Sequence, residues 1–352
     1  MRKVRRMSVC CANCFNDNQL KHFILNECHG GALSRCSFCR SEGVQLIDTG
    51  LLSEHFETLT KAFDVVESDG LSLVDALQQH FSIFNERISD KNTLLNQIFK
   101  DNQQLLSNQY KYSYTDLCTY GWASFKDEIV KLNRFFPQTH IYKEIFSKGD
   151  GSRVFFELTE TLLSTYSQGD ALFRARLSET MLTASEMEKP PANLASAGRA
   201  NPVGIPYLYL SNNIDTCIAE VRPSKGAKIC IATFRLNNQI KLLDLTNPRE
   251  RATFLFFNDT ELKEALDYTA LLEKFSYELS LPVLPTRTNL DYIPTQFICE
   301  FFKAVCGYAG VIFKSSFGFG DNIVLFNDED ITCERIMQYE ISEVINKHSS
   351  IS

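Results

Sequence analysis

The sequence predicts an α+β protein in which a zinc-knuckle segment and a helical domain precede a domain built around a mixed sheet. Three observations lead to this prediction. Six of the 12 cysteines lie within the first 39 residues. Apolar residues then recur at helical spacing up to about residue 150, and short runs typical of strands alternate with helical stretches from about residue 171 onward. A chain of 352 residues is long enough for two folding units.

Composition and charge exclude several classes of protein. Hydrophobic residues make up 44% of the chain and charged residues 22%, as in globular proteins. This composition excludes a chain that is mainly disordered, collagen-like or coiled coil. No uninterrupted apolar run approaches about 18 residues, and the N-terminus shows basic residues and cysteines instead of a signal peptide. We therefore expect a cytoplasmic protein that does not cross a membrane. A net charge of −7 argues against nucleic-acid binding by the whole surface. The basic N-terminal tail is the one observation in favour of a local nucleic-acid contact.

The cysteine cluster is typical of a structural zinc site. Two Cys-x2-Cys knuckles separated by 21 residues allow four thiolates to converge on one ion. The knuckle residues are Cys11, Cys14, Cys36 and Cys39. Neighbouring side chains keep other ligand sets open: Cys10, Cys28, His22 and His29. Disulfides are disfavoured without an export signal, and four thiolates leave no coordination position for water. The alternative to a structural zinc is a set of reduced, unligated cysteines.

The helical region follows this cluster. Apolar residues at helical spacing predict helices over 73–84 and 94–105. Ser72 or Asp69 is the expected N-cap of the first helix, and Asp90 is the expected N-cap of the second.

The second part combines strands and helices. The expected strands are 173–176, 207–210, 228–234, 240–245, 310–313 and 322–326. The expected helices are 214–221, 249–275 and 294–305. Asn213 or Asp215 marks the start of the first of these helices, and Pro223 ends it. Short strands with irregular loops favour an α+β sheet over a regular βαβ wind.

The second part must carry out its chemistry without histidine, because none occurs between residues 141 and 347. Serine-hydrolase triads, Cys-His proteases and most catalytic zinc sites are therefore excluded there. Glu220, within the apolar 214–221 helix, has two interpretations. It forms an ion pair with Arg222 or another arginine, or it is a pocket carboxylate that faces Arg174 and Arg176.

Several motifs of the second part occur in a linked order. They are FRAR at 173–176, GRAN and GIPYLY within 198–209, TCIAEVRP at 216–223, LLDLT at 242–246, GVIFKSS at 310–316 and NIVLF at 322–326. Together they resemble the RES domain, a family named after an arginine, a glutamate and a serine in this order. The cysteine knuckles followed by helices also resemble the N-terminal domain, grouped with HEPN proteins, that accompanies some RES domains.

The resemblance implies the domain limits: a zinc-knuckle segment over 1–45, a helical domain of the HEPN/RES N-terminal type over 46–150, and a RES domain over 165–346. Residues 147–152, which are polar and bear glycine, are the best candidate for the linker.

The resemblance also implies a fold similar to ADP-ribosyltransferases and an enzyme that cleaves the nicotinamide–ribose bond of NAD, as a glycohydrolase or a phosphorylase. RES proteins typically act as toxins of bacterial toxin–antitoxin pairs, with an Xre-type helix-turn-helix antitoxin as partner. Neither a membrane nor nucleic acid is expected as a partner, and self-association of the chain stays open. A protein ADP-ribosyltransferase that uses the same pocket is the first alternative. A non-catalytic or RNA-targeting binding module is the second.

The family positions carry over onto individual residues. The implied catalytic residues are Arg174, Tyr209, Glu220 and Ser315. The implied further substrate contacts are Arg199 and Asn201, together with Arg176 and Ser316 as alternatives in register to Arg174 and Ser315. This chemistry suits a domain without histidine, because nicotinamide leaves as a neutral pyridine and needs no general acid. Catalysis then depends on stabilising an oxocarbenium-like sugar, in this hypothesis by Glu220, with arginines on the pyrophosphate.

Overall fold

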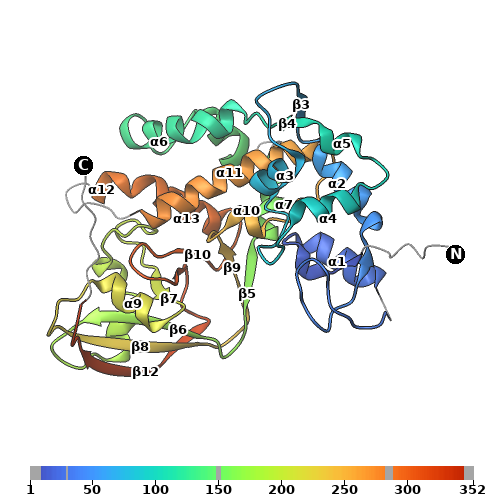
Figure 1. Cartoon of the computed structure of the whole chain (residues 1–352). Helices are drawn as coiled ribbons and strands as arrows, with labels where there is room; N and C mark the ends of the chain where they lie inside the picture. The colour runs from blue at the N-terminus through green and yellow to red at the C-terminus, as the bar shows by residue number, and fades with distance from the viewer. Residues whose placement is uncertain (1–8, 29–30, 148–151, 282–287, 345–352) are drawn as a thin grey trace, which may run out of the picture. The chain divides into compact units, whose positions relative to one another are not determined.

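A computed structural model describes residues 9–28, 31–147, 152–281 and 288–344 (Figure 1). The chain divides into two compact units that interleave along the sequence. The first unit comprises Met1–Trp122, Lys143–Thr161 and Asn247–Leu271, and the second comprises Ala123–Tyr142, Leu162–Thr246 and Leu272–Ser352. The proposed linker largely coincides with residues 148–151, which lie outside the described residues. None of the helices within the described ranges is long and apolar enough to span a membrane.

The first unit is mainly helical. Its helices are α1 (Asn18–Glu27), α2 (Ser53–Thr60), α3 (Leu73–Phe81), α4 (Lys91–Ile98), α5 (Gln104–Ser107), α7 (Ser152–Thr161) and α10 (Pro248–Arg251), and α11 (Glu261–Ser280) begins here. Its strands form two small antiparallel pairs: β1 (Val9–Cys10) with β2 (Ile47–Asp48), and β3 (Asp64–Val66) with β4 (Gln109–Lys111).

The core of the first unit is aromatic and includes the cysteine segment. Phe15, which directly follows the first knuckle, lies 5.8 Å from Phe56 and 6.2 Å from Phe84 between ring centroids. The backbone N–H of Asn85 donates to the carbonyl of Cys14 at 2.9 Å. The cysteine segment and the helices therefore share one core.

The predicted N-caps of this unit are confirmed. The Ser72 hydroxyl accepts from the Asp75 N–H, and the Asp90 carboxylate accepts from the Thr93 N–H. Each of these contacts satisfies a backbone donor that the first helical turn leaves unpaired. The predicted helix over 94–105 is wrong in extent, because α4 ends at Ile98 and a separate short α5 follows.

The predicted single helix over 249–275 is also wrong. It is two helices, α10 and α11, separated by the segment 252–260. In this segment, side-chain oxygens accept hydrogen bonds from backbone N–H groups that would bind carbonyls in a continuous helix. The buried carboxylate of Asp17 accepts from the Phe254 N–H at 2.7 Å, and the Asn258 side chain accepts from the Glu261 N–H at 3.1 Å. Asp17 is distant in sequence, so no local pattern reveals its contact, whereas Asn258 is a local N-cap signal for the start of α11.

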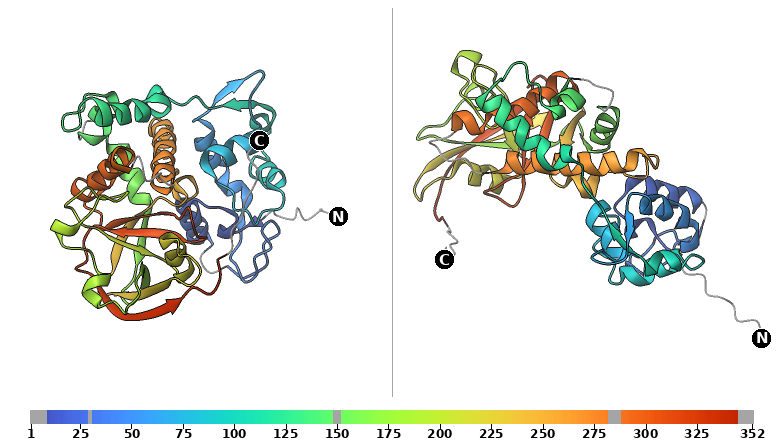
Figure 2. Two further views of the ribbon diagram at one scale, coloured as in Figure 1. Left: turned by 90° about the vertical axis from the view of Figure 1, so that its left-hand side faces the viewer. Right: turned by 90° about the horizontal axis from the view of Figure 1, so that it is seen from above.

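The second unit contains a mixed sheet, which confirms the predicted α+β class. Its strands are β5 (Leu163–Tyr166), β6 (Ala171–Leu177), β7 (Leu208–Ser211), β8 (Lys228–Leu236), β9 (Ile240–Asp244), β10 (Gly310–Lys314), β11 (Asp321–Leu325) and β12 (Ile331–Glu340). Their order across the sheet is β12-β8-β6-β7-β11-β10-β9-β5. β9 and β10 are parallel, and the other neighbours are antiparallel. The edge strand β12 is the red arrow at the lower border of the sheet in Figure 1 and in the left view of Figure 2.

All six predicted strands are present, and β5 and β12 were not predicted. The helices of this unit are α6 (Trp122–Lys131), α8 (Ala184–Met187), α9 (Ile214–Val221), α12 (Thr288–Asp291) and α13 (Ile293–Ala304), together with the end of α11. The predicted helix 214–221 matches α9. The Asn213 side chain accepts from the Thr216 N–H. The helix ends at Val221 and is followed by Arg222, which has a left-handed backbone, and by Pro223.

One junction divides this sheet. β6 pairs with β8 over seven residues, but β6 and β7 share only the pair Phe173 and Ser211. The strands β12-β8-β6 and β7-β11-β10-β9-β5 therefore form two half-sheets that separate next to this pair. On one side of β6, Leu172 joins a core with Leu208 and Leu210. On the other side, Ala175 packs with Cys217 of α9.

Candidate active site

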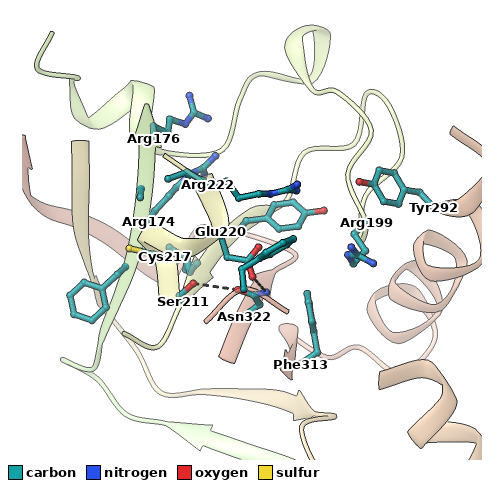
Figure 3. A pocket seen from close by; sticks show the side chains of 16 residues that line it. Arg174, Arg176, Arg199, Ser211, Cys217, Glu220, Arg222, Tyr292, Phe313 and Asn322 are labelled. Atoms are coloured by element: carbon teal, nitrogen blue, oxygen red, sulfur yellow. Dashed lines mark hydrogen bonds between the residues drawn. The ribbon is translucent and has the colours of Figure 1, made fainter. Parts of the chain in front are cut away.

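A cavity of about 360 Å³ opens within the second unit where the two half-sheets separate (Figure 3). Its lining combines residues of β6, β7, α9 and the loop around Arg199 with Phe313 and Asn322 of the strands β10 and β11. The volume lies at the lower end of the range typical of ligand sites. The junction of the sheet therefore brings together segments that are up to about 150 residues apart in sequence.

A carboxylate held by neutral groups is the central feature of the cavity. Glu220 Oε1 accepts a hydrogen bond from Ser315 Oγ at 2.6 Å and another from Asn322 Nδ2 at 2.7 Å. Within the described residues Glu220 forms no ion pair, so the interpretation as a partner of Arg222 is not what the structure contains. Ser315 Oγ in turn accepts from the Gly318 N–H at 2.9 Å, which leaves its proton for Glu220.

Four arginines line the same cavity: Arg174, Arg176, Arg199 and Arg222. Glu220 is the one carboxylate among the lining residues. This excess of positive charge, in a chain with a net charge of −7, suits an anionic ligand. Burial and the neighbouring Arg176 lower the pKa of Arg174 to about 10, so Arg174 stays protonated at neutral pH.

Backbone carbonyls orient two of these arginines. Arg174 Nη1 donates to the carbonyl of Glu188 at 3.3 Å, and Arg199 Nη1 donates to the carbonyl of Glu278 at 3.0 Å. Burial lowers the pKa of Arg199 as well. Neither contact neutralises the guanidinium, so both charges remain available to a ligand.

Arg222 is held differently. Its guanidinium lies 4.4 Å from the centroid of the Phe317 ring, a cation–π contact. Its backbone φ of 46° lies in the left-handed region, which non-glycine residues rarely adopt. The turn that ends α9 therefore directs this side chain into the cavity lining.

The ring of Tyr209 lines the cavity, while its hydroxyl is used in the loop that precedes β7. The phenol donates to Asn201 Oδ1 at 2.7 Å and accepts from the Ala200 N–H at 2.9 Å. Burial raises the pKa of Tyr209, so the phenol stays neutral. Gly198 permits this arrangement, because a Cβ there would lie 2.4 Å from the Tyr209 hydroxyl oxygen.

Asn201 does not line the cavity. Its Nδ2 donates to the carbonyls of Ser196, Pro202 and Ile205 at 3.0, 3.1 and 3.0 Å, and only 4% of the residue is exposed. Its Nδ2 thus binds carbonyls of the loop that carries Arg199, and its Oδ1 accepts from the Tyr209 hydroxyl of β7. Asn201 is therefore a buried support of the loop that carries Arg199 and is not part of the cavity lining.

The two register alternatives differ in outcome. Both Arg174 and Arg176 line the cavity, with Arg174 the more deeply buried. Neither serine is among the lining residues, but Ser315 contacts Glu220, whereas the neighbouring Ser316 is exposed. The predicted residues that the structure brings together are thus Arg174, Arg176, Arg199, Tyr209, Glu220 and Ser315.

Sequence reasoning missed several lining residues, of which Asn322 and Ser211 matter most. They face each other across β11 and β7, and Ser211 Oγ donates to Asn322 Oδ1 at 3.4 Å (Figure 3). Each lies at one end of an apolar sequence typical of a strand. A polar residue at that position usually indicates a turn, so neither residue was predicted to belong to the site. Only the pairing of the strands could have identified them.

The predicted knuckle sulfurs form a candidate metal site in the first unit. The Sγ atoms of Cys11, Cys14, Cys36 and Cys39 lie within 4.8 Å of one another, and all four residues are buried. Two of the sulfur–sulfur distances are 3.4 and 3.5 Å. A tetrahedral zinc thiolate site requires sulfurs about 3.8 Å apart, so the four side chains fit this ion.

The alternative ligands lie outside this cluster. Cys10 and Cys28 are buried but do not belong to it, and His22 is exposed on α1. His29 lies outside the described residues.

Comparisons with known proteins concern mainly the second half of the chain. The family model described as "RES domain" matches residues 171–342. Among solved structures, the crystal structure of the M. tuberculosis MbcT–MbcA toxin–antitoxin complex matches with 14% sequence identity and a TM-score of 0.32, over 53% of this chain and 93% of that chain. A TM-score of this size does not establish a common fold. No curated protein matches the sequence significantly. The chain therefore carries a RES domain at residues 171–342.

Proposed function

We propose that the protein is an enzyme that cleaves the nicotinamide–ribose bond of NAD and acts as a toxin of a bacterial toxin–antitoxin or defence system. The observation that carries the proposal is the cavity in which Glu220, held by two neutral donors, lies among four arginines. The RES domain over 171–342 supports it, because NAD is the substrate that the family resemblance implies.

Glu220 has the chemistry for this reaction. As the C1′–N bond breaks, its electron pair passes to the nicotinamide nitrogen, and positive charge develops on the ribose. The Glu220 carboxylate offsets that charge and binds a ribose hydroxyl. Water then adds to C1′ and loses a proton, which gives ADP-ribose; phosphate as acceptor would give the ribosyl phosphate.

The remaining predicted residues have complementary roles. Arg174 and Arg199 bind the pyrophosphate, since each keeps its charge while a carbonyl orients it. The Tyr209 ring stacks on nicotinamide. Ser315 orients Glu220 through its hydroxyl.

The proposal is tested with purified full-length chain and NAD labelled in both the nicotinamide and the adenosine. We expect free nicotinamide from the wild type and a loss of about 10²- to 10³-fold in rate for Glu220→Gln. Ser315→Ala and Ser316→Ala form a matched pair, in which the first loses activity and the second, on an exposed side chain, retains it. Unchanged NAD loss in both Glu220→Gln and Arg174→Ala would overturn the enzymatic assignment.

The same experiment separates the acceptors. Labelled ADP-ribose free in solution indicates hydrolysis, a labelled sugar phosphate that requires added phosphate indicates phosphorolysis, and labelled protein indicates a protein ADP-ribosyltransferase. In cells, expression of the wild type should lower the NAD content and stop growth. A neighbouring reading frame for a small helix-turn-helix protein of Xre type would supply the proposed antitoxin.

We also propose that zinc binds the four knuckle cysteines and has a structural role in the first unit. The close approach of four buried sulfurs supports this role, because the four thiolates would fill the coordination sphere of zinc and leave no open position for a substrate. The domain limits 1–45, 46–150 and 165–346 remain part of this proposal.

A further inference from the structure

The single carboxylate of the cavity avoids the four arginines around it. An unrestrained glutamate side chain next to guanidinium groups would turn into an ion pair. Glu220 instead has Oε1 engaged by Ser315 and Asn322, and Oε2 accepts no hydrogen bond from any residue that the structure describes. Oε2 is thus the oxygen that remains for a ligand.

The orientation of the Asn322 amide follows from the sheet. Asn322 pairs with Ser211 of β7 on one side and with Phe313 of β10 on the other. Its Oδ1 accepts from Ser211 Oγ at 3.4 Å, which directs its Nδ2 toward Glu220 Oε1 at 2.7 Å (Figure 3). Ser211 is also the residue at which the two half-sheets join.

We propose that Asn322 is a positioning residue for Glu220: together with Ser315 it holds Oε1, directs Oε2 to the ligand and prevents an ion pair between Glu220 and the cavity arginines. The inference rests on the proposed function for its kinetic test. Neutral donors are essential to this role, because they orient the carboxylate without cancelling its charge. An ion pair would neutralise both the carboxylate that faces the ribose and an arginine that binds phosphate.

The kinetic test uses three substitutions at one position. Asn322→Asp keeps the shape of the side chain but replaces the donor with a second carboxylate, Asn322→Ala removes the donor, and Asn322→Gln keeps the amide on a longer chain. For Asn322→Ala we expect kcat to fall about 10- to 100-fold, the worth of one hydrogen bond to a charged group. KM should change less than about threefold, because the arginines are untouched.

The order of the variants decides between positioning and packing. Positioning predicts that Asn322→Asp has a lower kcat than Asn322→Ala and that Asn322→Gln recovers part of the activity. If Asn322 only filled space, the isosteric Asn322→Asp would be the most active of the three, and that result would overturn the proposal.

A structural readout is independent of any activity. Crystal structures of the wild type and Asn322→Asp should differ in the Glu220 carboxylate, which leaves Ser315 and turns toward a cavity arginine. Asn213→Ala is the control, since it removes the N-cap of α9 without touching either donor and should lower the melting temperature while Glu220 keeps its contacts. A Glu220 that stays in place in Asn322→Asp refutes the inference. A wild type that does not consume NAD refutes the proposed function instead, and the crystal structures still decide the inference.

Discussion

Asn201 offers a test of how the candidate site is supported, because the family resemblance implies a ligand contact and the structure shows a buried support. The perturbation is Asn201→Asp, which keeps the size of the side chain and replaces its NH2 group with oxygen. Nδ2 donates to three backbone carbonyls at 3.0, 3.1 and 3.0 Å. In the variant an oxygen faces these three carbonyl oxygens.

The magnitude follows from those contacts. Each net hydrogen bond contributes about 1 kcal/mol, and a buried acceptor without a donor costs about 1–3 kcal/mol. One NH2 group shared among three carbonyls therefore accounts for a destabilisation of about 3–5 kcal/mol in the second unit. Arg199 lies in the same loop, so the substitution should also displace Arg199 and lower the affinity for NAD.

The assay is chemical denaturation followed by circular dichroism, combined with hydrogen exchange of residues 195–206. We expect a lower midpoint for the second unit and faster exchange across this loop. Asn96→Asp, at an exposed position on α4, is the control and should change stability by less than about 0.5 kcal/mol. A variant with wild-type stability and exchange that has lost NAD affinity would show that Asn201 contacts the ligand directly, and the reasoning would fail.

Three further predictions concern other parts of the chain. Cys36→Ser should abolish the binding of one zinc per chain, measured by metal analysis after dialysis, and destabilise the first unit; full retention of zinc would contradict the four-cysteine site. Burial and Arg249 lower the pKa of His80 from 6.5 to about 4. As the pH falls, the unfolded chain therefore binds a proton at His80 before the folded chain does. Stability should be complete above about pH 6.5 and decline by about 3 kcal/mol toward pH 4, and His80→Phe should flatten this part of the profile in denaturation experiments. Gly320→Ala should destabilise α9 by about 1–3 kcal/mol, because its Cβ would lie 2.0 Å from Asn213 Nδ2; an unchanged melting temperature would contradict this.

Local patterns were sufficient for most elements of the second unit. The strand runs contain apolar and β-branched residues between turn signals, and α9 has both a capping residue and a terminating proline. In the first unit, a long-range contact made one helix prediction wrong. Asp17 interrupts the expected helix over 249–275 through two backbone N–H groups far from it in sequence. The local signal in this segment is Asn258, which caps the Glu261 N–H at the start of α11.

The sequence by itself determined which chemistry is available. Its four knuckle cysteines, its stretch without histidine and its linked RES motifs pointed to a metal site and to a site of arginines and a carboxylate. Tertiary structure decided the partner of each group. Whether Glu220 meets an arginine or two neutral donors depends on the pairing of β11 with β7, and whether Ser315 or Ser316 reaches it depends on the direction of the β10–β11 loop. These contacts join residues about 100 positions apart, where strand register, not local propensity, sets which side chains meet.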